Sequence, residues 1–213
     1  MNNTVLSKLT KEYPELTPVL PQIWDAFSAI HDVFEEGGRL FAAGNGGSAA
    51  DADHLVGELM KSFRLPRPLP DGEKEALCLA DAELGARLAE TLEGALPAFS
   101  LSSHPAVSTA FANDRDPDAV YAQLLYGWGR PGDLFLAFST SGNARDLCLA
   151  VTAAKARGMK TLLLTGETGG VLATMCDLSV RVPARETFRV QELHLPVYHA
   201  LCALLEDAFF GHA

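Results

Sequence analysis

Positive charge is scarce in this sequence. Its 213 residues include 17 Lys and Arg against 27 Asp and Glu, which gives a formal net charge of -10. No run of Lys or Arg offsets this balance, whereas proteins that bind nucleic acids usually carry a basic patch or stripe. We therefore expect no nucleic-acid ligand. A small anionic ligand stays possible, because donors in a local loop can outweigh a net negative field.

Long apolar runs and closely spaced cysteines are missing too. No stretch reaches the roughly 20 uncharged residues that a membrane-spanning helix needs, and the N-terminus has no signal-peptide pattern. The four cysteines are scattered in apolar surroundings, without the spacing of a metal or redox motif. We expect a cytoplasmic protein without membrane contact, whose thiols are reduced and buried.

Short apolar segments alternate with helical patterns along the chain. This alternation is typical of a parallel sheet that is covered by helices on both faces, so we expect an α/β fold. Strands are expected near residues 39–43, 98–101, 133–138, 161–164 and 178–182. Helices are expected near residues 18–36, 48–63, 82–92, 106–112, 118–128, 145–156, 171–176 and 190–209.

Specific residues mark the ends of the first long helix and one predicted loop. Thr17 is a suitable N-cap for the first long helix, since Pro18 fits the first helical position and Gly37-Gly38 ends the pattern. The segment Arg64–Glu75 contains three prolines and a glycine, which predicts a loop.

Two short loops each follow an apolar strand and open a helix. Residues 44–48 read GNGGS, and residues 139–143 read STSGN. Helix N-termini offer unpaired N–H groups and the positive end of a dipole, and the hydroxyls add donors. The first loop lacks the Lys of a phosphate-binding P-loop, and Ala49 stands where a dinucleotide fingerprint needs glycine. Together the loops predict a phosphate-bearing small molecule.

Polar residues on two helices form a second candidate site. His54 and Glu58 are four residues apart, so they project from one helix face; a simple surface pair is the alternative. Gln191 and His199 interrupt the apolar C-terminal helix. Two His, one Glu and one Gln could bind a metal such as zinc, although the sequence alone does not bring these helices together.

These motifs, in this order, resemble the phosphoheptose isomerase branch of the sugar isomerase (SIS) domain family. The resemblance spans nearly the whole chain and includes the leading helix. Besides the two loops, it is carried by Asp51, His54, Glu58, Asn113, Asp114, Gln191, Glu192 and His199.

The resemblance implies a particular architecture. It is a three-layer doubly wound sandwich around a central parallel sheet of about five strands, with a long N-terminal helix. Residues 1–213 would form a single SIS domain, in which the helical segment 1–37 serves oligomerisation. A homotetramer with active sites at the subunit interfaces is implied as well.

The resemblance also implies roles for individual residues. Glu58 would be the catalytic base and His199 its acid/base partner. Zinc, which some members bind, would be held by His54, Glu58, Gln191 and His199. Ala144 stands where the family usually has Ser, which removes one phosphate-binding hydroxyl. The substrate and its phosphate would be bound by Asn45, Gly46, Gly47, Ser48, Asn113, Asp114, Ser139, Thr140, Ser141, Asn143 and Gln191.

The implied activity is that of a sugar-phosphate isomerase of the intramolecular oxidoreductase class. It would convert sedoheptulose 7-phosphate to D-glycero-D-manno-heptose 7-phosphate through a cis-enediol, in heptose and lipopolysaccharide biosynthesis. One base must reach both carbons, and a second group must move protons between the oxygens. A carboxylate and a histidine suit these tasks, but a carboxylate bound to zinc is a poorer base.

Two alternatives stay open. The chain could isomerise another ketose phosphate, which Ala144 and the long region Arg64–Leu92 would favour. It could instead be a non-catalytic sugar-phosphate-binding protein that partners the replication initiator DnaA. That sister group lacks residues matching Glu58 and His199, so their presence here favours catalysis.

Overall fold

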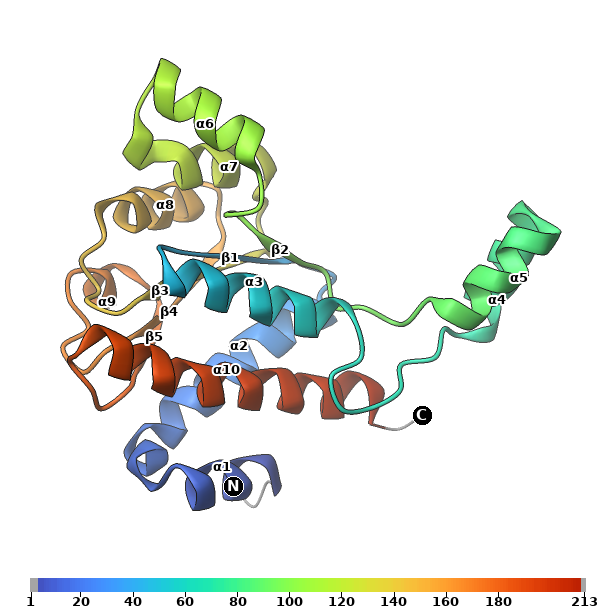
Figure 1. Ribbon diagram of the computed structural model, residues 1–213, viewed down its shortest axis with the longest axis horizontal. Helices are drawn as coiled ribbons and strands as arrows, with labels where there is room; N and C mark the ends of the chain where they lie inside the picture. Colours follow the sequence, from blue (N-terminus) through green and yellow to red (C-terminus); the bar gives the residue numbers. More distant parts are fainter. Residues whose placement is uncertain (1–3, 212–213) are drawn as a thin grey trace.

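A five-stranded parallel sheet forms the centre of the computed structural model, which describes residues 4–211 (Figure 1). The strand order is β2-β1-β3-β4-β5, and every neighbouring pair is parallel. This topology confirms the expected α/β fold and the number of strands. The strands are β1 (Leu40–Gly44), β2 (Ala98–Ser100), β3 (Leu134–Ser139), β4 (Lys160–Thr165) and β5 (Leu178–Arg181).

Helices cover both faces of the sheet, which confirms the three layers. Leu40 and Ala42 of β1 belong to one hydrophobic cluster, while Phe41 and Ala43 belong to another, as the two-residue period of a strand requires. The first face is covered by α1 (Thr4–Glu12), α2 (Leu20–Glu35), α3 (Gly47–Met60) and α10 (Thr187–Phe210). The second is covered by α7 (Val120–Trp128), α8 (Arg145–Ala156) and α9 (Leu172–Met175), and α6 (Pro105–Asp114) contacts α7.

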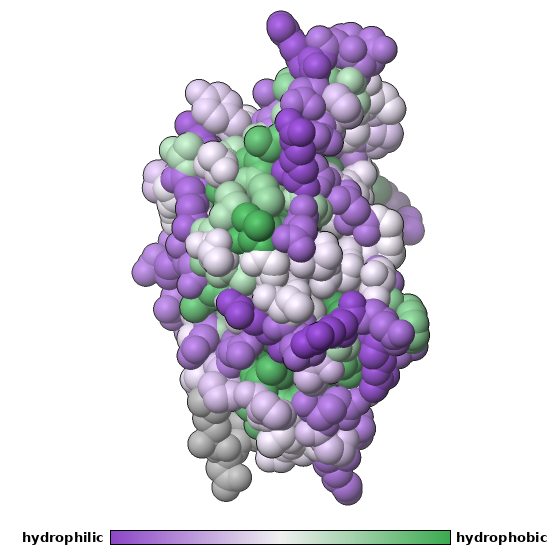
Figure 2. Space-filling view, turned by 90° about the vertical axis from the view of Figure 1, so that its left-hand side faces the viewer, coloured by the Kyte–Doolittle hydropathy of each residue, from purple (hydrophilic) through white to green (hydrophobic). Residues whose placement is uncertain are grey.

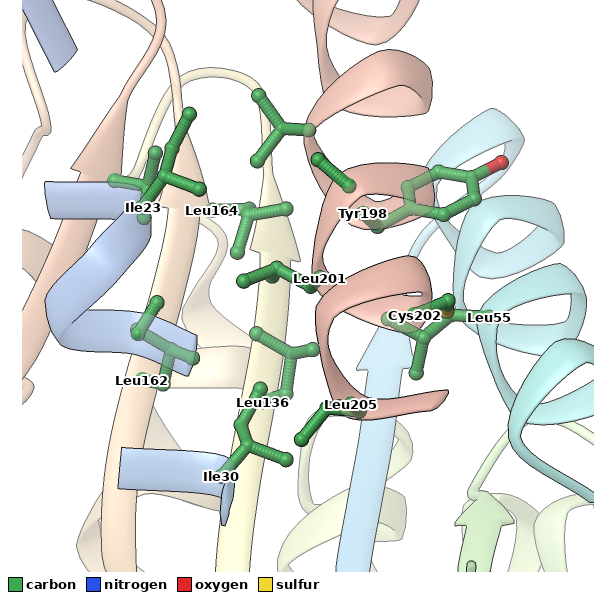
Figure 3. Close-up of a cluster of buried hydrophobic side chains, with 14 of the residues drawn as sticks. Ile23, Ile30, Leu55, Leu136, Leu162, Leu164, Tyr198, Leu201, Cys202 and Leu205 are labelled. Carbon is green, nitrogen blue, oxygen red and sulfur yellow. The ribbon is translucent and has the colours of Figure 1, made fainter. Parts of the chain in front are cut away.

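Helix α10 is the centre of the first face. Figure 3 shows Leu201 and Leu205 of α10 directed toward Leu136 on the sheet, while the Tyr198 hydroxyl points toward α3. These side chains are buried, and so is Leu55 on the inner face of α3. The packing fixes α3 and α10 side by side, although Pro196 lies inside α10.

The N-terminal region has more helix than the sequence pattern indicates. Helix α1 was not expected, and the predicted long helix begins as a 3₁₀ turn, η1 (Pro14–Val19), that leads into α2. The prediction that Thr17 is an N-cap is wrong: its hydroxyl donates to the Pro14 carbonyl at 2.7 Å, inside the 3₁₀ turn. The long helix does end just before Gly37, as expected.

The predicted loop Arg64–Glu75 is wrong from Asp71 onward. A helical hairpin of α4 (Asp71–Ala80) and α5 (Ala82–Thr91) projects from the body, and residues 71–91 are called the arm below (Figure 1). Gly85 is its single buried residue, and a Cβ there would lie 2.0 Å from the Leu77 carbonyl oxygen, so glycine allows the close helix contact.

The arm is closed at its base. Pro68 forms an antiparallel bridge with Glu93, and the Gly94 N–H donates to the Arg67 carbonyl at 2.8 Å. The arm exposes leucines at positions 79, 84 and 88. The chain therefore enters and leaves the arm at one place on the body.

The surface shows further features of the composition. Figure 2 shows a mostly hydrophilic face with a hydrophobic area in its upper half. Within residues 4–211, no helix is long and apolar enough to cross a membrane.

The expectation of four buried thiols is wrong. Cys78 on the arm is exposed, and Cys148 and Cys176 are partly exposed; all four cysteines are free.

Between the named elements, η2 (Pro117–Ala119) is a short 3₁₀ turn that leads into α7. Its N-cap is Asp116, whose carboxylate accepts from the Asp118 N–H. The helix expected near residues 118–128 therefore begins as 3₁₀ and becomes α-helical at Val120.

Candidate functional site

Both predicted loops lie at the point where the strand order reverses. Strand β1 pairs with β2 on one side and with β3 on the other, and Gly44 is in register with Phe138. The loops that follow β1 and β3 therefore leave the same edge of the sheet next to each other. In open parallel sheets this reversal point is the usual place for a ligand.

The first loop leads into α3 without a capping side chain. Gly46, with a φ of 57°, is the N-cap, and Ser48 in the first helical turn is buried. The Asn45 amide donates to the Asp146 carboxylate at 2.8 Å, so it ties the first loop to α8. Asn45 and Asp146 line a cavity of about 250 Å³ together with Ser102 and Tyr121.

The second loop is held by its own hydroxyls. Ser139 Oγ accepts from the Gly142 N–H, and Ser141 Oγ accepts from the Asn143 N–H, both at 3.2 Å. Gly142 has a φ of +68°, and a Cβ there would lie 2.0 Å from the Gly169 carbonyl oxygen, so only glycine fits. Thr140 is partly buried beside these residues.

The start of α8 lies beside the second loop and carries the acidic Asp146 in its first turn. Its N-cap is Ala144, which supplies no side-chain acceptor. Neither α3 nor α8 is thus capped by its own N-cap side chain, and both begin at the same edge of the sheet. This arrangement fits a phosphate group.

Asn113 and Asp114 lie apart from the two loops. They are exposed at the end of α6, where the Asn113 amide donates to Asp114 at 2.9 Å. Asp114 lines a separate hollow over α6 and α7. No hydrogen bond or ion pair among the described residues joins either side chain to the loops, and the substrate-binding role of this pair stays a prediction.

Three members of the second predicted group, His54, Glu58 and His199, lie near one another between α3 and α10. His54 Nε2 lies 3.2 Å from Glu58 Oε1, and the rings of His54 and His199 have centroids 5.0 Å apart. The Phe63 ring is tilted relative to the His199 ring, and the centroids of the two rings are 5.4 Å apart. The His199 Nε2 atom is buried and has no hydrogen-bond partner among residues 4–211. A carboxylate and two imidazoles, one of them with an unpaired nitrogen, therefore lie near one another between the two helices.

Three neighbours of this group were not predicted as site residues. The Tyr198 hydroxyl lies 2.9 Å from His54 Nδ1 and 3.4 Å from Asp51 Oδ1, and Lys61 Nζ lies 2.8 Å from Glu58 Oε2. Asp51 and Lys61 each lie three residues from a predicted site residue, so helical spacing could have found them. Tyr198 is on α10, but its hydroxyl contacts His54 and Asp51 on α3. No spacing rule within one helix reveals such a contact.

Electrostatics keep Glu58 charged and His199 neutral. Burial opposes ionisation of Glu58, but Lys61 and then His54 together lower its pKa below the ordinary value. Burial, followed by repulsion from His54, lowers the pKa of His199. Burial also raises the pKa of Asp51, against the Tyr198 hydrogen bond. An ionised carboxylate beside a neutral imidazole is the pairing that proton transfer needs.

The predicted zinc ligands fit zinc by type but not by arrangement. His54 and Glu58 are together, whereas Gln191 lies two helical turns before His199, against Gly47, where a Cβ would come within 2.6 Å of its Nε2. Across residues 4–211, no three His, Cys, Asp or Glu side chains gather closely enough to hold a metal ion.

Comparison with known proteins gives consistent matches. Two sequence models of the SIS domain match residues 17–166 and 129–204. The phosphoheptose isomerase of Aneurinibacillus thermoaerophilus is 35% identical over 196 residues, which are 92% of this chain and 84% of that protein. The phosphoheptose isomerase of Thiobacillus denitrificans is 37% identical over 194 residues, 90% and 85% of the two chains.

Solved structures agree with these sequence matches. The phosphoheptose isomerase GmhA of Neisseria gonorrhoeae superimposes with a TM-score of 0.74 at 27% identity, covering 95% of each chain. A phosphoheptose isomerase of Francisella tularensis gives 0.75 at 26% identity, covering 96% of this chain and all of that one. The likeness thus extends over nearly the whole chain.

Proposed function

Because the chain belongs to the SIS-domain family, in its phosphoheptose isomerase branch, we propose that it is an aldose–ketose isomerase acting on a phosphorylated sugar. The substrate that we propose is sedoheptulose 7-phosphate, with D-glycero-D-manno-heptose 7-phosphate as the product. The relatives are named isomerases, so isomerase and not oxidoreductase is the class to assign. One carbon is oxidised while its neighbour is reduced, with no net redox change.

The position of Glu58 is the observation that supports this proposal most directly. Its side chain is only 14% exposed, its carboxylate lies 3.2 Å from His54 Nε2, and Lys61 and His54 lower its pKa against the effect of burial. In the proposed reaction it removes a proton from C1 of the ketose and returns a proton to C2. The intermediate between the two transfers is the cis-enediol.

His199 is proposed as the group that moves protons between the two oxygens. As O2 gains a proton in the first transfer, O1 must lose one in the second, so a neutral imidazole can act in both directions. The lowered pKa keeps His199 neutral near pH 7, and its Nε2 is not occupied by another described residue.

The two loops are proposed to anchor the phosphate. Gly47 and Glu58 are eleven residues apart on α3, which corresponds to about 16 Å along the helix axis. A long, extended sugar phosphate suits this separation better than a three-carbon one. Fixing its phosphate at Ser48, Ser139, Thr140 and Ser141 would align the reacting carbons, which can contribute several kcal/mol to catalysis.

Assembly and metal binding extend the proposal. We propose a homotetramer whose active sites lie at the interfaces, and mass measurement by light scattering tests it. Mixing the Ser141→Ala and Glu58→Gln proteins would restore activity if one site uses residues of two subunits.

Zinc binding and the cytoplasmic location stay predictions. The metal content of the protein purified without chelator tests the prediction of zinc.

The experiment that tests the activity is proton NMR with sedoheptulose 7-phosphate in D2O. Deuterium incorporation with a new aldose signal supports both the chemistry and the sugar. Incorporation without product supports the chemistry on a different sugar. No incorporation by the folded protein, with and without added zinc, would contradict the proposal for this sugar and favour a binding protein.

A further inference from the structure

A buried arginine lies directly behind the proposed base. The Arg67 side chain has no exposed surface, and its guanidinium is 2.9 Å from Glu206 Oε1. It also donates to the carbonyls of Leu59 and Glu58 at 2.8 Å and 3.1 Å. The last carbonyls of a helix have no partner within the helix, so Arg67 supplies partners at the end of α3.

Glu206 fixes the chain that leaves α3. Its two carboxylate oxygens accept from the backbone N–H groups of Phe63, Arg64 and Leu65, at 2.7 to 3.0 Å. Glu206 is on α10, two turns beyond His199. The Arg67–Glu206 pair thus connects the helix that carries Glu58 to the helix that carries His199.

Stability alone is a weak explanation for this pair. Replacing a buried ion pair by apolar residues of similar size is often neutral or stabilising, because both charges must leave water. Apolar residues, however, cannot donate to two helix carbonyls and accept from three N–H groups. The hydrogen bonds of the pair instead fix the position of the end of α3 relative to α10.

We propose that Arg67 is a positioning residue for catalysis, which with Glu206 holds Glu58 and His199 at their working separation. The inference rests on the proposed function, since it takes Glu58 as the base. A displacement of about 1 Å at a catalytic group can cost about a hundredfold in rate. Substrate anchoring at the two loops would not change, because Arg67 lies at the other end of α3.

The variant Arg67→Met tests this proposal, and the chain contains a matched control. Arg39 also pairs with a carboxylate, Asp133 at 2.7 Å, also donates to a backbone carbonyl, and also lies over a phenylalanine ring. It precedes β1, at the edge of the sheet opposite the loops. Arg39→Met therefore removes an ion pair of the same type, although a less buried one, far from the site.

We expect Arg67→Met to lower kcat about ten- to hundredfold with KM changed by less than about threefold. Arg39→Met should keep kcat within about twofold. Both are measured below their unfolding temperatures, with the folded fraction checked by circular dichroism. If Arg67→Met does not fold, Arg67→Lys replaces it, because Lys keeps the charge but cannot bond the carboxylate and both carbonyls at once; a kcat loss of at least about fivefold is then expected.

The outcomes separate this inference from the proposed function. Wild-type activity with a normal kcat in folded Arg67→Met, or in folded Arg67→Lys where that variant replaces it, overturns the positioning role and leaves the isomerase proposal intact. Equal losses of kcat in the Arg67 and Arg39 variants overturn it too, since they would indicate a general effect of stability. An inactive wild type with every substrate contradicts the proposed function itself, and with it the catalytic role of Arg67.

Discussion

The helix pair α3–α10 and the helix pair α4–α5 differ in the side chains that lie between the two helices. Between α3 and α10 lie the Tyr198–His54 contact and the Arg67–Glu206 pair, surrounded by buried leucines. Between α4 and α5 only Gly85 is buried, and leucines face solvent. Polar groups that are enclosed and fixed can do chemistry, whereas a hairpin without a core can only present a surface.

The largest expected difference between the two pairs is catalytic. Glu58→Gln should lower kcat by about 10²- to 10⁴-fold, because an amide cannot take the proton that a general base must remove. The same exchange on the arm, Glu83→Gln, should leave kcat unchanged. Steady-state kinetics with sedoheptulose 7-phosphate measure both, and near-normal turnover in Glu58→Gln would remove that residue from the mechanism.

Leucine truncation should show the next largest contrast. Leu55→Ala, in the core between α3 and α10, should cost about 2–5 kcal/mol of unfolding free energy through lost burial and a cavity. Leu84→Ala on the exposed face of the arm should change it by less than about 0.5 kcal/mol. Urea titration measures both values. Equal costs would mean that the arm leucine is covered in solution, most simply by another subunit.

We expect acid to lower the stability of the folded protein through His194 on α10. Burial lowers the pKa of this fully buried histidine to about 4, against a smaller opposing contribution from the Thr165 backbone. The unfolded chain binds a proton below about pH 6.5, so stability falls as the pH drops from 6.5 toward 4. The loss at pH 5 should be about 2 kcal/mol.

The variant His194→Leu isolates that contribution. Its unfolding free energy between pH 7 and pH 5 should fall by about 2 kcal/mol less than that of the wild type. Identical pH dependence in the two proteins would show that His194 does not titrate as its burial predicts.

Removal of the arm should have the smallest effect on the fold. Because Pro68 pairs with Glu93, a short Gly-Ser linker can join the two ends of the base. We expect the melting temperature to change by only a few degrees, since α4 and α5 contact chiefly each other. Loss of the folded state, seen by circular dichroism, would refute this view of the arm.

Local patterns predicted most of the elements. Helix α8 has the predicted bounds, and each strand is found within about two residues of its expected position. The arm was missed in part because Pro70 and Gly72 predict a loop, yet Pro70 is the N-cap position of α4, where proline is tolerated. Thr17 does not cap α2 because its hydroxyl donates to the Pro14 carbonyl inside η1, and α2 begins after Val19.

The site was predictable only as far as sequence spacing reaches. The pair His54 and Glu58 follows from helical geometry and is found at 3.2 Å. The approach of His199 to His54 depends on how α10 packs on α3, which no local pattern encodes. Arg67 and Glu206 are 139 residues apart, and each would be expected at the surface when considered alone.

The exposed thiol of Cys78 makes the arm a natural attachment point for a reporter. It is the one cysteine in the exposed class, on a projection that is joined to the body at a single base. Burial raises the pKa of the partly exposed Cys148 and Cys176 thiols, so a maleimide dye added in limiting amount should label Cys78 first, without any change of the sequence. Fluorescence anisotropy of that dye would then follow, in real time, whether the arm tumbles freely or is immobilised when chains assemble.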